Sequence, residues 1–174
     1  MDKNKLKKHV FYSLQLSRKH ITFKFDKSVS ENNRNLVIEY LNEPLGWVSK
    51  GYTFEEVSDN KKKPLVILYF KTSYEMKQKY KAFANLSVTD FATIPLTISF
   101  NKTNWDKPPL EFIIINKEKD TRLIRYRKYL VQHEFGHVLG FDHPELPKKY
   151  SKCNVMIQQS KYTEPYCQAN YSQL

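Results

Sequence analysis

Long apolar runs and clusters of cysteine are both missing from this sequence. No window of eighteen apolar residues occurs among its 174 residues, so we expect no membrane-spanning helix. The two cysteines, Cys153 and Cys167, are too few to build the Cys-rich, four-ligand sites that usually hold structural zinc. Internal repeats and low-complexity linkers are also absent. Because the length allows one core but not comfortably two, we predict a single domain over residues 1–174.

A convincing export signal is lacking as well. The first eight residues are basic, but the apolar stretch Val10–Leu16 is short and is interrupted by polar side chains. We therefore expect an intracellular or virion location. No segment of propeptide length precedes Ile21, so we expect no latency that depends on removal of a propeptide.

Acidic residues are outnumbered by basic ones, 18 against 29, which leaves a net charge of +11. Such an excess favours acidic partners: nucleic acid, anionic membranes or acidic peptides. The lysines are scattered, however, and they accompany many Asn, Ile, Tyr and Phe residues, a composition that an A/T-rich genome produces regardless of function. We therefore interpret them mainly as a solvated surface and expect no specific nucleic-acid binding.

Apolar periodicity predicts a sheet of five strands. The predicted strands are Ile21–Phe25, Tyr52–Val57, Leu65–Phe70, Pro95–Phe100 and Glu111–Ile115. Residues 101–109 should form a turn, and the lysine-rich segment Ser73–Phe83 fits a helix or a loop equally well.

Two helices are predicted from the same periodicity. The first should be capped by Ser28 or Ser30 and should reach Leu41. The second should be capped by Asp120 or Thr121 and should run to about residue 139. Its buried side is expected to contain Ile124, Leu130, Val131 and Val138.

The stretch His133–His143 contains a metal-binding motif, because it reads H-E-x-x-H-x-x-G-x-x-H. Residues four apart lie on one face of a helix, so His133 and His137 can offer two imidazoles to one metal ion. A third ligand at His143 requires a sharp turn, which Gly140 permits because glycine accepts a positive φ. Three histidines leave the fourth position of a zinc ion open to water, as in catalytic sites. Glu134 lies beside the ligands and is free to act on that water.

These eleven residues resemble the signature of the metzincins, which include matrixins, astacins and reprolysins. Metzincins also carry a methionine in a turn beneath the metal, and Cys153–Met156 follows at a suitable distance. A closer resemblance is to a family of bacterial metzincin-like proteins, largely exported, that is known as a domain of unknown function. The matching segments begin near residue 20 and are Pro44–Trp47, Tyr52–Phe54, Asn101–Trp105, Arg125–Val131, Val155–Ser160 and Cys167–Tyr171.

The resemblance implies an α+β zincin fold, in which a twisted mixed five-stranded sheet packs on a long active-site helix. An upper subdomain would span about residues 20–142, and a small irregular lower subdomain about residues 143–174. Met156 would form an apolar floor under the imidazoles. A peptide would bind extended along an edge strand, for which Pro95–Phe100 is the candidate, and Ile157–Ser160 would wall a side-chain pocket. The metal-bound tyrosine of astacins is not expected, because Gln158 occupies its position.

This pattern predicts a zinc-dependent endopeptidase with a peptide or protein substrate. Zinc lowers the pKa of its bound water and polarises the scissile carbonyl. Glu134 would take the proton of that zinc-bound water and later pass it to the leaving amine. The alternative is a zinc-bearing binding protein with little turnover, attached to an acidic partner by its lysine-rich surface. The intact Glu134 argues against this alternative.

Cys153 and Cys167 allow two states, which the sequence leaves open. A disulfide between them would close a loop of about fifteen residues and add roughly 3 kcal/mol of stability. Two free, buried thiols are expected instead if the compartment is reducing.

Overall fold

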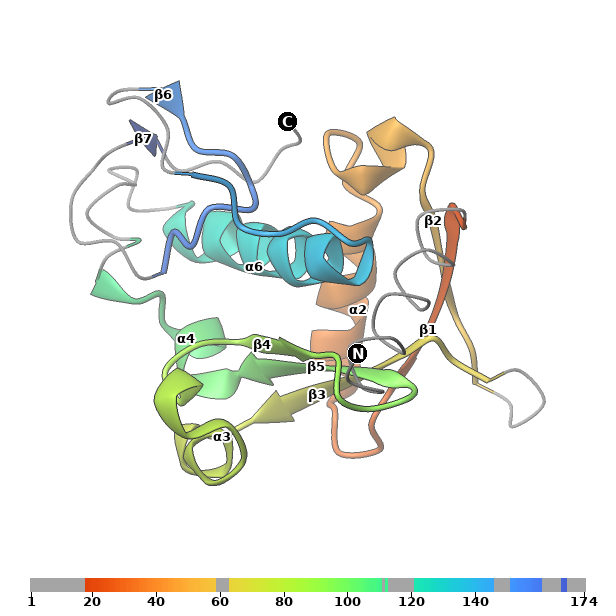
Figure 1. Ribbon diagram of the computed structural model, residues 1–174, viewed down its shortest axis with the longest axis horizontal. Coiled ribbons are helices and arrows are strands. Elements are labelled where there is room, and N and C mark those ends of the chain that lie inside the picture. Colours follow the sequence, from red (N-terminus) through yellow and green to blue (C-terminus); the bar gives the residue numbers. More distant parts are fainter. Residues whose placement is uncertain are drawn as a thin grey trace, which may run out of the picture.

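The protein is an α+β fold built on a five-stranded mixed sheet (Figure 1). The computed structural model describes residues 18–58, 63–110, 112, 121–145, 151–160 and 167–168. The strands are β1 (His20–Phe25), β2 (Thr53–Glu56), β3 (Val66–Lys71), β4 (Val88–Asp90) and β5 (Leu96–Asn101), in the order β2-β1-β3-β5-β4. Four of them are parallel, and β4 lies antiparallel to β5 at one edge.

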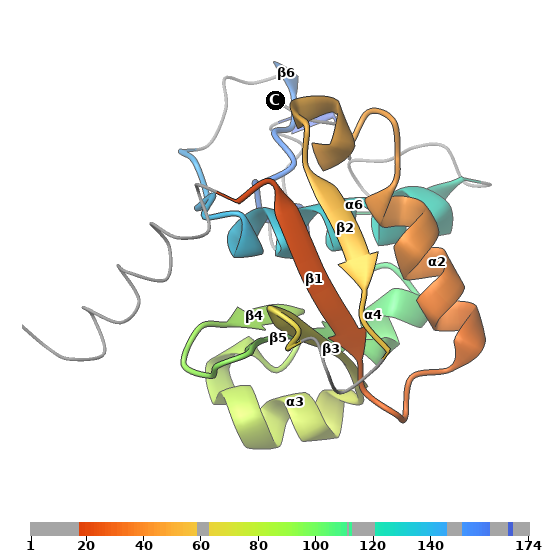
Figure 2. The same ribbon diagram turned by 90° about the vertical axis from the view of Figure 1, so that its right-hand side faces the viewer.

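The strands follow their sequence patterns. β1 alternates, so that Ile21, Phe23 and Phe25 are buried while the intervening residues are partly exposed. β5 is buried along its whole length, because it pairs on both sides and helices lie on both of its faces. In Figures 1 and 2, α6 (Arg122–Val138) lies on one side of strands β3, β4 and β5, and α3 (Ser73–Tyr80) lies on the other.

The helices begin at recognisable caps. α2 (Glu31–Leu41) starts after Ser30, whose side chain accepts a hydrogen bond from the backbone N–H of Asn33. α3 starts with a capping box, in which Thr72 and Glu75 each bond the other's backbone. The structure also contains two short 3₁₀ helices, η1 (Trp47–Lys50) and η2 (Lys81–Phe83), and a small parallel pair, β6 (Ser151–Lys152) with β7 (Cys167–Gln168). No described helix is long and apolar enough to span a membrane.

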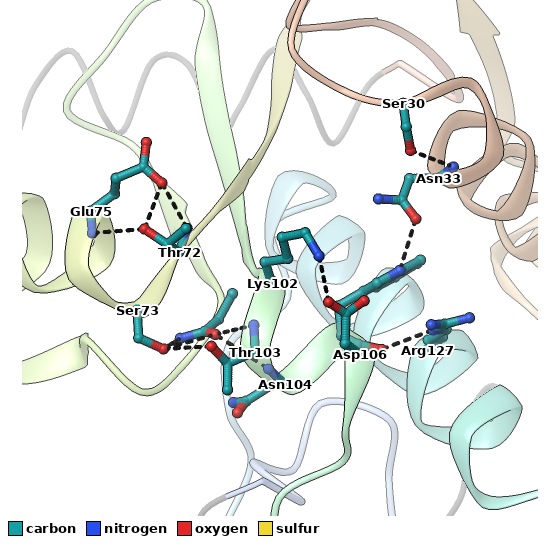
Figure 3. A network of polar contacts seen from close by, with 12 residues as sticks. Ser30, Asn33, Thr72, Ser73, Glu75, Lys102, Thr103, Asn104, Asp106 and Arg127 are labelled. Carbon is teal, nitrogen blue, oxygen red and sulfur yellow. Dashed lines mark hydrogen bonds and ion pairs between the residues drawn. The ribbon is translucent and has the colours of Figure 1, made fainter.

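A short helix, α4 (Lys102–Asp106), ties the sheet to both long helices (Figure 3). The Asn101 side chain caps it by accepting from two backbone N–H groups of its first turn. Trp105 is fully buried, and its indole Nε1 donates to Asn33 Oδ1 of α2 at 3.1 Å. Arg127 of α6 donates from Nε to the Trp105 carbonyl at 2.9 Å. These contacts fix α6, and therefore the predicted metal ligands, relative to the sheet.

Most predicted elements are confirmed, with boundaries shifted by one or two residues. Four predicted strands correspond to β1, β2, β3 and β5, and both predicted helices are present as α2 and α6. The undecided segment Ser73–Phe83 is helical, because its Thr72–Glu75 capping box supplies a start signal that apolar periodicity does not report.

Other predictions about the elements were wrong. The fifth strand of the described sheet is β4, which was not predicted. Phe112 of the predicted strand Glu111–Ile115 is helical, and the other positions of that segment lie outside the described residues. Residues 101–109 contain α4, because Asn101 caps a helix there. The side chain of Ile124 is 49% exposed, whereas Leu130, Val131 and Val138 are buried as predicted. Thr121 is the N-cap residue of α6, as predicted, although its side chain makes no capping hydrogen bond.

Candidate metal centre

Three histidines converge at the C-terminal end of α6. His133 and His137 lie one turn apart on the helix, and His143 returns to them after the helix ends. The Nε2 atom of His143 lies 3.1 Å from that of His137 and 3.2 Å from that of His133. The chain reverses at Gly140, whose φ is +95°, as the motif predicts. The structure thus brings together all three predicted ligands.

Backbone carbonyls set the tautomers of the two helical histidines. Nδ1 of His133 lies 2.8 Å from the Val155 carbonyl oxygen, and Nδ1 of His137 lies 2.9 Å from that of Phe141. A carbonyl oxygen only accepts hydrogen bonds, so both Nδ1 atoms carry hydrogen and both Nε2 atoms present lone pairs. Mainly through burial, the pKa of His137 is lowered to about 4 and that of His133 well below its usual value. Both rings are therefore neutral at pH 7.

The three nitrogens fit a tetrahedral zinc ion. Zinc–nitrogen bonds of about 2.0–2.1 Å place two ligand nitrogens about 3.3–3.4 Å apart, close to the separations seen here. Among the described residues, this is the one group of histidine, cysteine, aspartate or glutamate side chains placed to hold a metal ion. The donor set and its geometry therefore fit zinc.

Met156 lies against the turn of α6 that carries His133 and His137. It is buried at a turn in which the Asn154 side chain accepts from the Met156 backbone N–H at 2.8 Å. A Cβ atom on Gly136 would overlap Met156 Sδ and would lie 2.8 Å from Trp47 Cζ2. Only a glycine therefore lets the methionine and the tryptophan pack against the helix between the two histidines.

Trp47 supports the centre from far away in the sequence. Its ring stacks on Phe141, with centroids 4.7 Å apart, and the Phe141 carbonyl orients His137. Its Nε1 donates to the Gln132 carbonyl at 2.7 Å, and its backbone N–H donates to Gln132 Oε1 at 3.1 Å. Sequence reasoning used Trp47 only as part of a resemblance. Nothing in the spacing of the residues predicts that it packs beside the ligands.

Glu134 is buried and meets the edge strand β4. Its carboxylate Oε2 lies 2.6 Å from Thr89 Oγ1, and its carbonyl oxygen lies 3.1 Å from the same hydroxyl. Burial raises the pKa of Glu134 to about 7, while the bond to Thr89 acts in the opposite direction. Thr89 was not among the predicted site residues, because Pro95–Phe100 was taken as the edge. That segment lies between β3 and β4, so the edge prediction was wrong.

The segment after Met156 is held to α6 by a buried tyrosine. Tyr129 donates to the Ile157 carbonyl and accepts from the Gln159 backbone N–H, both at 3.0 Å. Burial raises the pKa of Tyr129, so the phenol stays protonated and keeps donating. Ile157 and Gln159 are themselves buried, which leaves Gln158 and Ser160 as the more accessible members of the predicted pocket wall.

Of the two states that the sequence allows for the cysteines, a disulfide or two free thiols, the structure contains the disulfide. Cys153 is buried and disulfide-bonded, and no described cysteine is free. Because the chain has two cysteines, its partner is Cys167. The bond adjoins the turn that carries Val155 and Met156, so it restrains the backbone carbonyl that orients His133.

Comparison with known proteins gives a family for this chain. A model of the family described as "Protein of unknown function (DUF3152)" matches residues 20–171. The chain belongs to the DUF3152 family. No curated protein and no solved structure shows significant similarity to it. The DUF3152 match covers the three histidines, Glu134, Thr89 and Met156. It agrees with the expected resemblance to a domain of unknown function from about residue 20, whereas membership of the metzincins stays a prediction.

Proposed function

We propose that this protein is a zinc-dependent endopeptidase of the metzincin type. The observation that carries the proposal is the convergence of three imidazole Nε2 atoms on one point, next in sequence to the buried carboxyl group of Glu134. His133, His137 and His143 would hold the metal. Imidazole ligands also suit copper, iron and nickel, but three histidines in a tetrahedral arrangement with one open position are typical of catalytic zinc.

The metal and Glu134 would have separate roles in the reaction. When bound, zinc supplies Lewis acidity, which lowers the pKa of a water ligand and polarises a carbonyl. Glu134 acts as the general base, takes one proton from the attacking water and delivers it to the departing amine. Burial raises the pKa of Glu134 in the metal-free protein, and the charge of a bound cation would act in the opposite direction. The products are a free carboxyl end and a free amino end.

The position of β4 supports an extended peptide as the substrate. β4 is the edge of the sheet, so its outer backbone groups can pair with an added strand. Thr89 of this strand contacts Glu134, so a peptide paired with β4 would pass beside the general base. Strand pairing uses the peptide backbone and needs no chain terminus, which favours cleavage within a chain.

The proposal is tested by separating metal binding from turnover. Glu134→Gln keeps the size of the side chain and leaves three imidazoles, so its zinc content and melting temperature should match those of wild type. Its cleavage of a diverse peptide library should fall by about 10²- to 10⁴-fold, the usual effect of losing a general acid-base group. The matched control is His143→Ala, which should lose zinc.

Each result has a definite meaning. A wild-type protein that holds zinc but cleaves nothing, with or without added chelator, would favour the alternative of a zinc-bearing binding protein. A Glu134→Gln variant that cleaves at the wild-type rate would remove Glu134 from the mechanism. Loss of zinc in that variant would show that the carboxylate holds the metal.

A further inference from the structure

We propose that Thr89 is a positioning residue, which holds the Glu134 carboxylate in its working orientation. This inference rests on the proposed function. It starts from the 2.6 Å contact between Thr89 Oγ1 and Glu134 Oε2. This distance lies in the range of charge-assisted O–H···O⁻ bonds, which are stronger than bonds between neutral groups.

The Thr89 hydroxyl makes a second contact, which allows it to hydrogen-bond the Glu134 carboxyl group in both of its protonation states. Thr89 Oγ1 also lies 3.1 Å from the Glu134 carbonyl oxygen. A hydroxyl has one hydrogen to donate and lone pairs that accept. While the carboxylate is charged, Thr89 donates to Oε2. When the carboxyl carries the proton taken from water, it can donate to Thr89 Oγ1, whose own hydrogen then turns to the carbonyl. The same side-chain orientation is thus supported before and after proton transfer.

The sheet fixes the position of Thr89 itself. Thr89 pairs with Ile98 of β5, which is completely buried. The next residue, Asp90, forms an ion pair of 3.2 Å with Lys79 of α3. β4 is therefore anchored by its neighbouring strand and by a helix on the opposite side of the sheet from α6. A rigid strand can place the hydroxyl reproducibly against the helix that carries Glu134.

Among the described residues, no other side chain forms a hydrogen bond with the Glu134 carboxylate. Thr89 is the hydrogen-bond partner that the structure gives to the carboxylate of Glu134, which is itself buried. Without the hydroxyl, the carboxylate would lose this bond and could rotate among other side-chain orientations. A displacement of about 1 Å at a reacting group can reduce the rate by roughly 10²-fold.

The test removes the hydroxyl and keeps the shape of the side chain. In the zinc-loaded full-length protein, Thr89→Val should reduce kcat for a cleaved peptide by about tenfold or more, with little change in KM. Thr89→Ser restores a hydroxyl and should recover most of the lost rate. In a Glu134→Gln background, Thr89→Val should cause little further loss, because its effect passes through the carboxylate.

A matched control is available on the neighbouring strand. Thr97 of β5 is buried, and its Oγ1 has no hydrogen-bond partner among the described residues. Thr97→Val is the same chemical change without loss of a hydrogen bond, so kcat and KM should both stay at wild-type values. A loss as large as that of Thr89→Val would show that the effect comes from packing in the sheet, and it would overturn the inference.

A second measurement does not depend on activity. A double-mutant cycle on the unfolding of the metal-free protein, made with Thr89→Val and Glu134→Ala, should show non-additive effects on the denaturation midpoint. Additive effects, or a Thr89→Val variant with wild-type kcat, would overturn the inference and leave the peptidase assignment intact. A wild-type protein without peptidase activity would overturn both the assignment and the inference.

Discussion

Replacement of Gly136 by alanine should destabilise this protein, although the same change stabilises most helices. In an ordinary helix interior, Gly→Ala contributes up to about 1 kcal/mol. Here the new Cβ would overlap Met156 Sδ and lie 2.8 Å from Trp47 Cζ2. Both neighbours are 1% exposed, so neither can swing into solvent. Overpacking of this kind costs about 1–3 kcal/mol. We expect a net loss of roughly 1–2 kcal/mol, because the steric term exceeds the helical gain.

The same substitution should weaken the metal site without touching a ligand. A displaced Trp47 would carry its stacking partner Phe141 with it, and the Phe141 carbonyl orients His137. Loss of such an orienting contact typically lowers metal affinity by about 10- to 100-fold. Zinc affinity can be measured by competition with a chromophoric chelator. Thermal unfolding of the metal-free protein should show a melting temperature lower by about 2–4 °C for each kcal/mol lost.

A second substitution tests the cause. Met156→Ala frees the space that the new methyl group needs, so in the Gly136→Ala background it should cost less stability than it does in wild type. Gly136→Ala with an unchanged or higher melting temperature and wild-type zinc affinity would refute the reasoning. It would mean that the helix and the methionine turn can separate at little cost.

Three further predictions concern the surroundings of the site. Gln132→Leu should lower the free energy of unfolding by about 1–3 kcal/mol, because the buried backbone N–H of Trp47 loses Gln132 Oε1 as its hydrogen-bond acceptor. An unchanged urea midpoint would contradict this prediction. Reduction of the Cys153–Cys167 disulfide should lower the free energy of unfolding by roughly 3 kcal/mol, and with it the melting temperature. A phosphine is the suitable reductant, because dithiols would chelate the zinc ion. Because the pKa of His137 is lowered to about 4, protons compete for its Nε2 only in acid, so zinc content after dialysis should persist at neutral pH and fall toward pH 4; loss of zinc at neutral pH would contradict this.

The sequence alone was enough to predict that His133, His137 and His143 converge, because their arrangement is local. Two histidines four residues apart lie on one face of any helix, and Gly140 can take the positive φ that returns His143 to them. The strands with clear apolar patterns and the two long helices were predictable for the same reason, since burial repeats along the chain with the period of the element.

The edge of the sheet was decided by tertiary structure. β4 spans Val88–Asp90, and all three residues are only partly buried, so it lacks the length and alternation that reveal a strand. It forms because its backbone pairs with β5, whose own pattern does not show which strands lie beside it. Thr89 therefore could not be connected to Glu134, 45 residues later, before the strand order was known.

The support of the metal centre was also decided by contacts between distant segments. Trp47 reaches Gln132 across 85 positions, and the Val155 carbonyl reaches His133 across 22. Neither contact leaves a periodic or local signal, because each depends on how α6 packs against the loops around it. The positions of the three histidines are local information, whereas the groups that orient His133 and the carboxylate of Glu134 come from segments that only folding brings together.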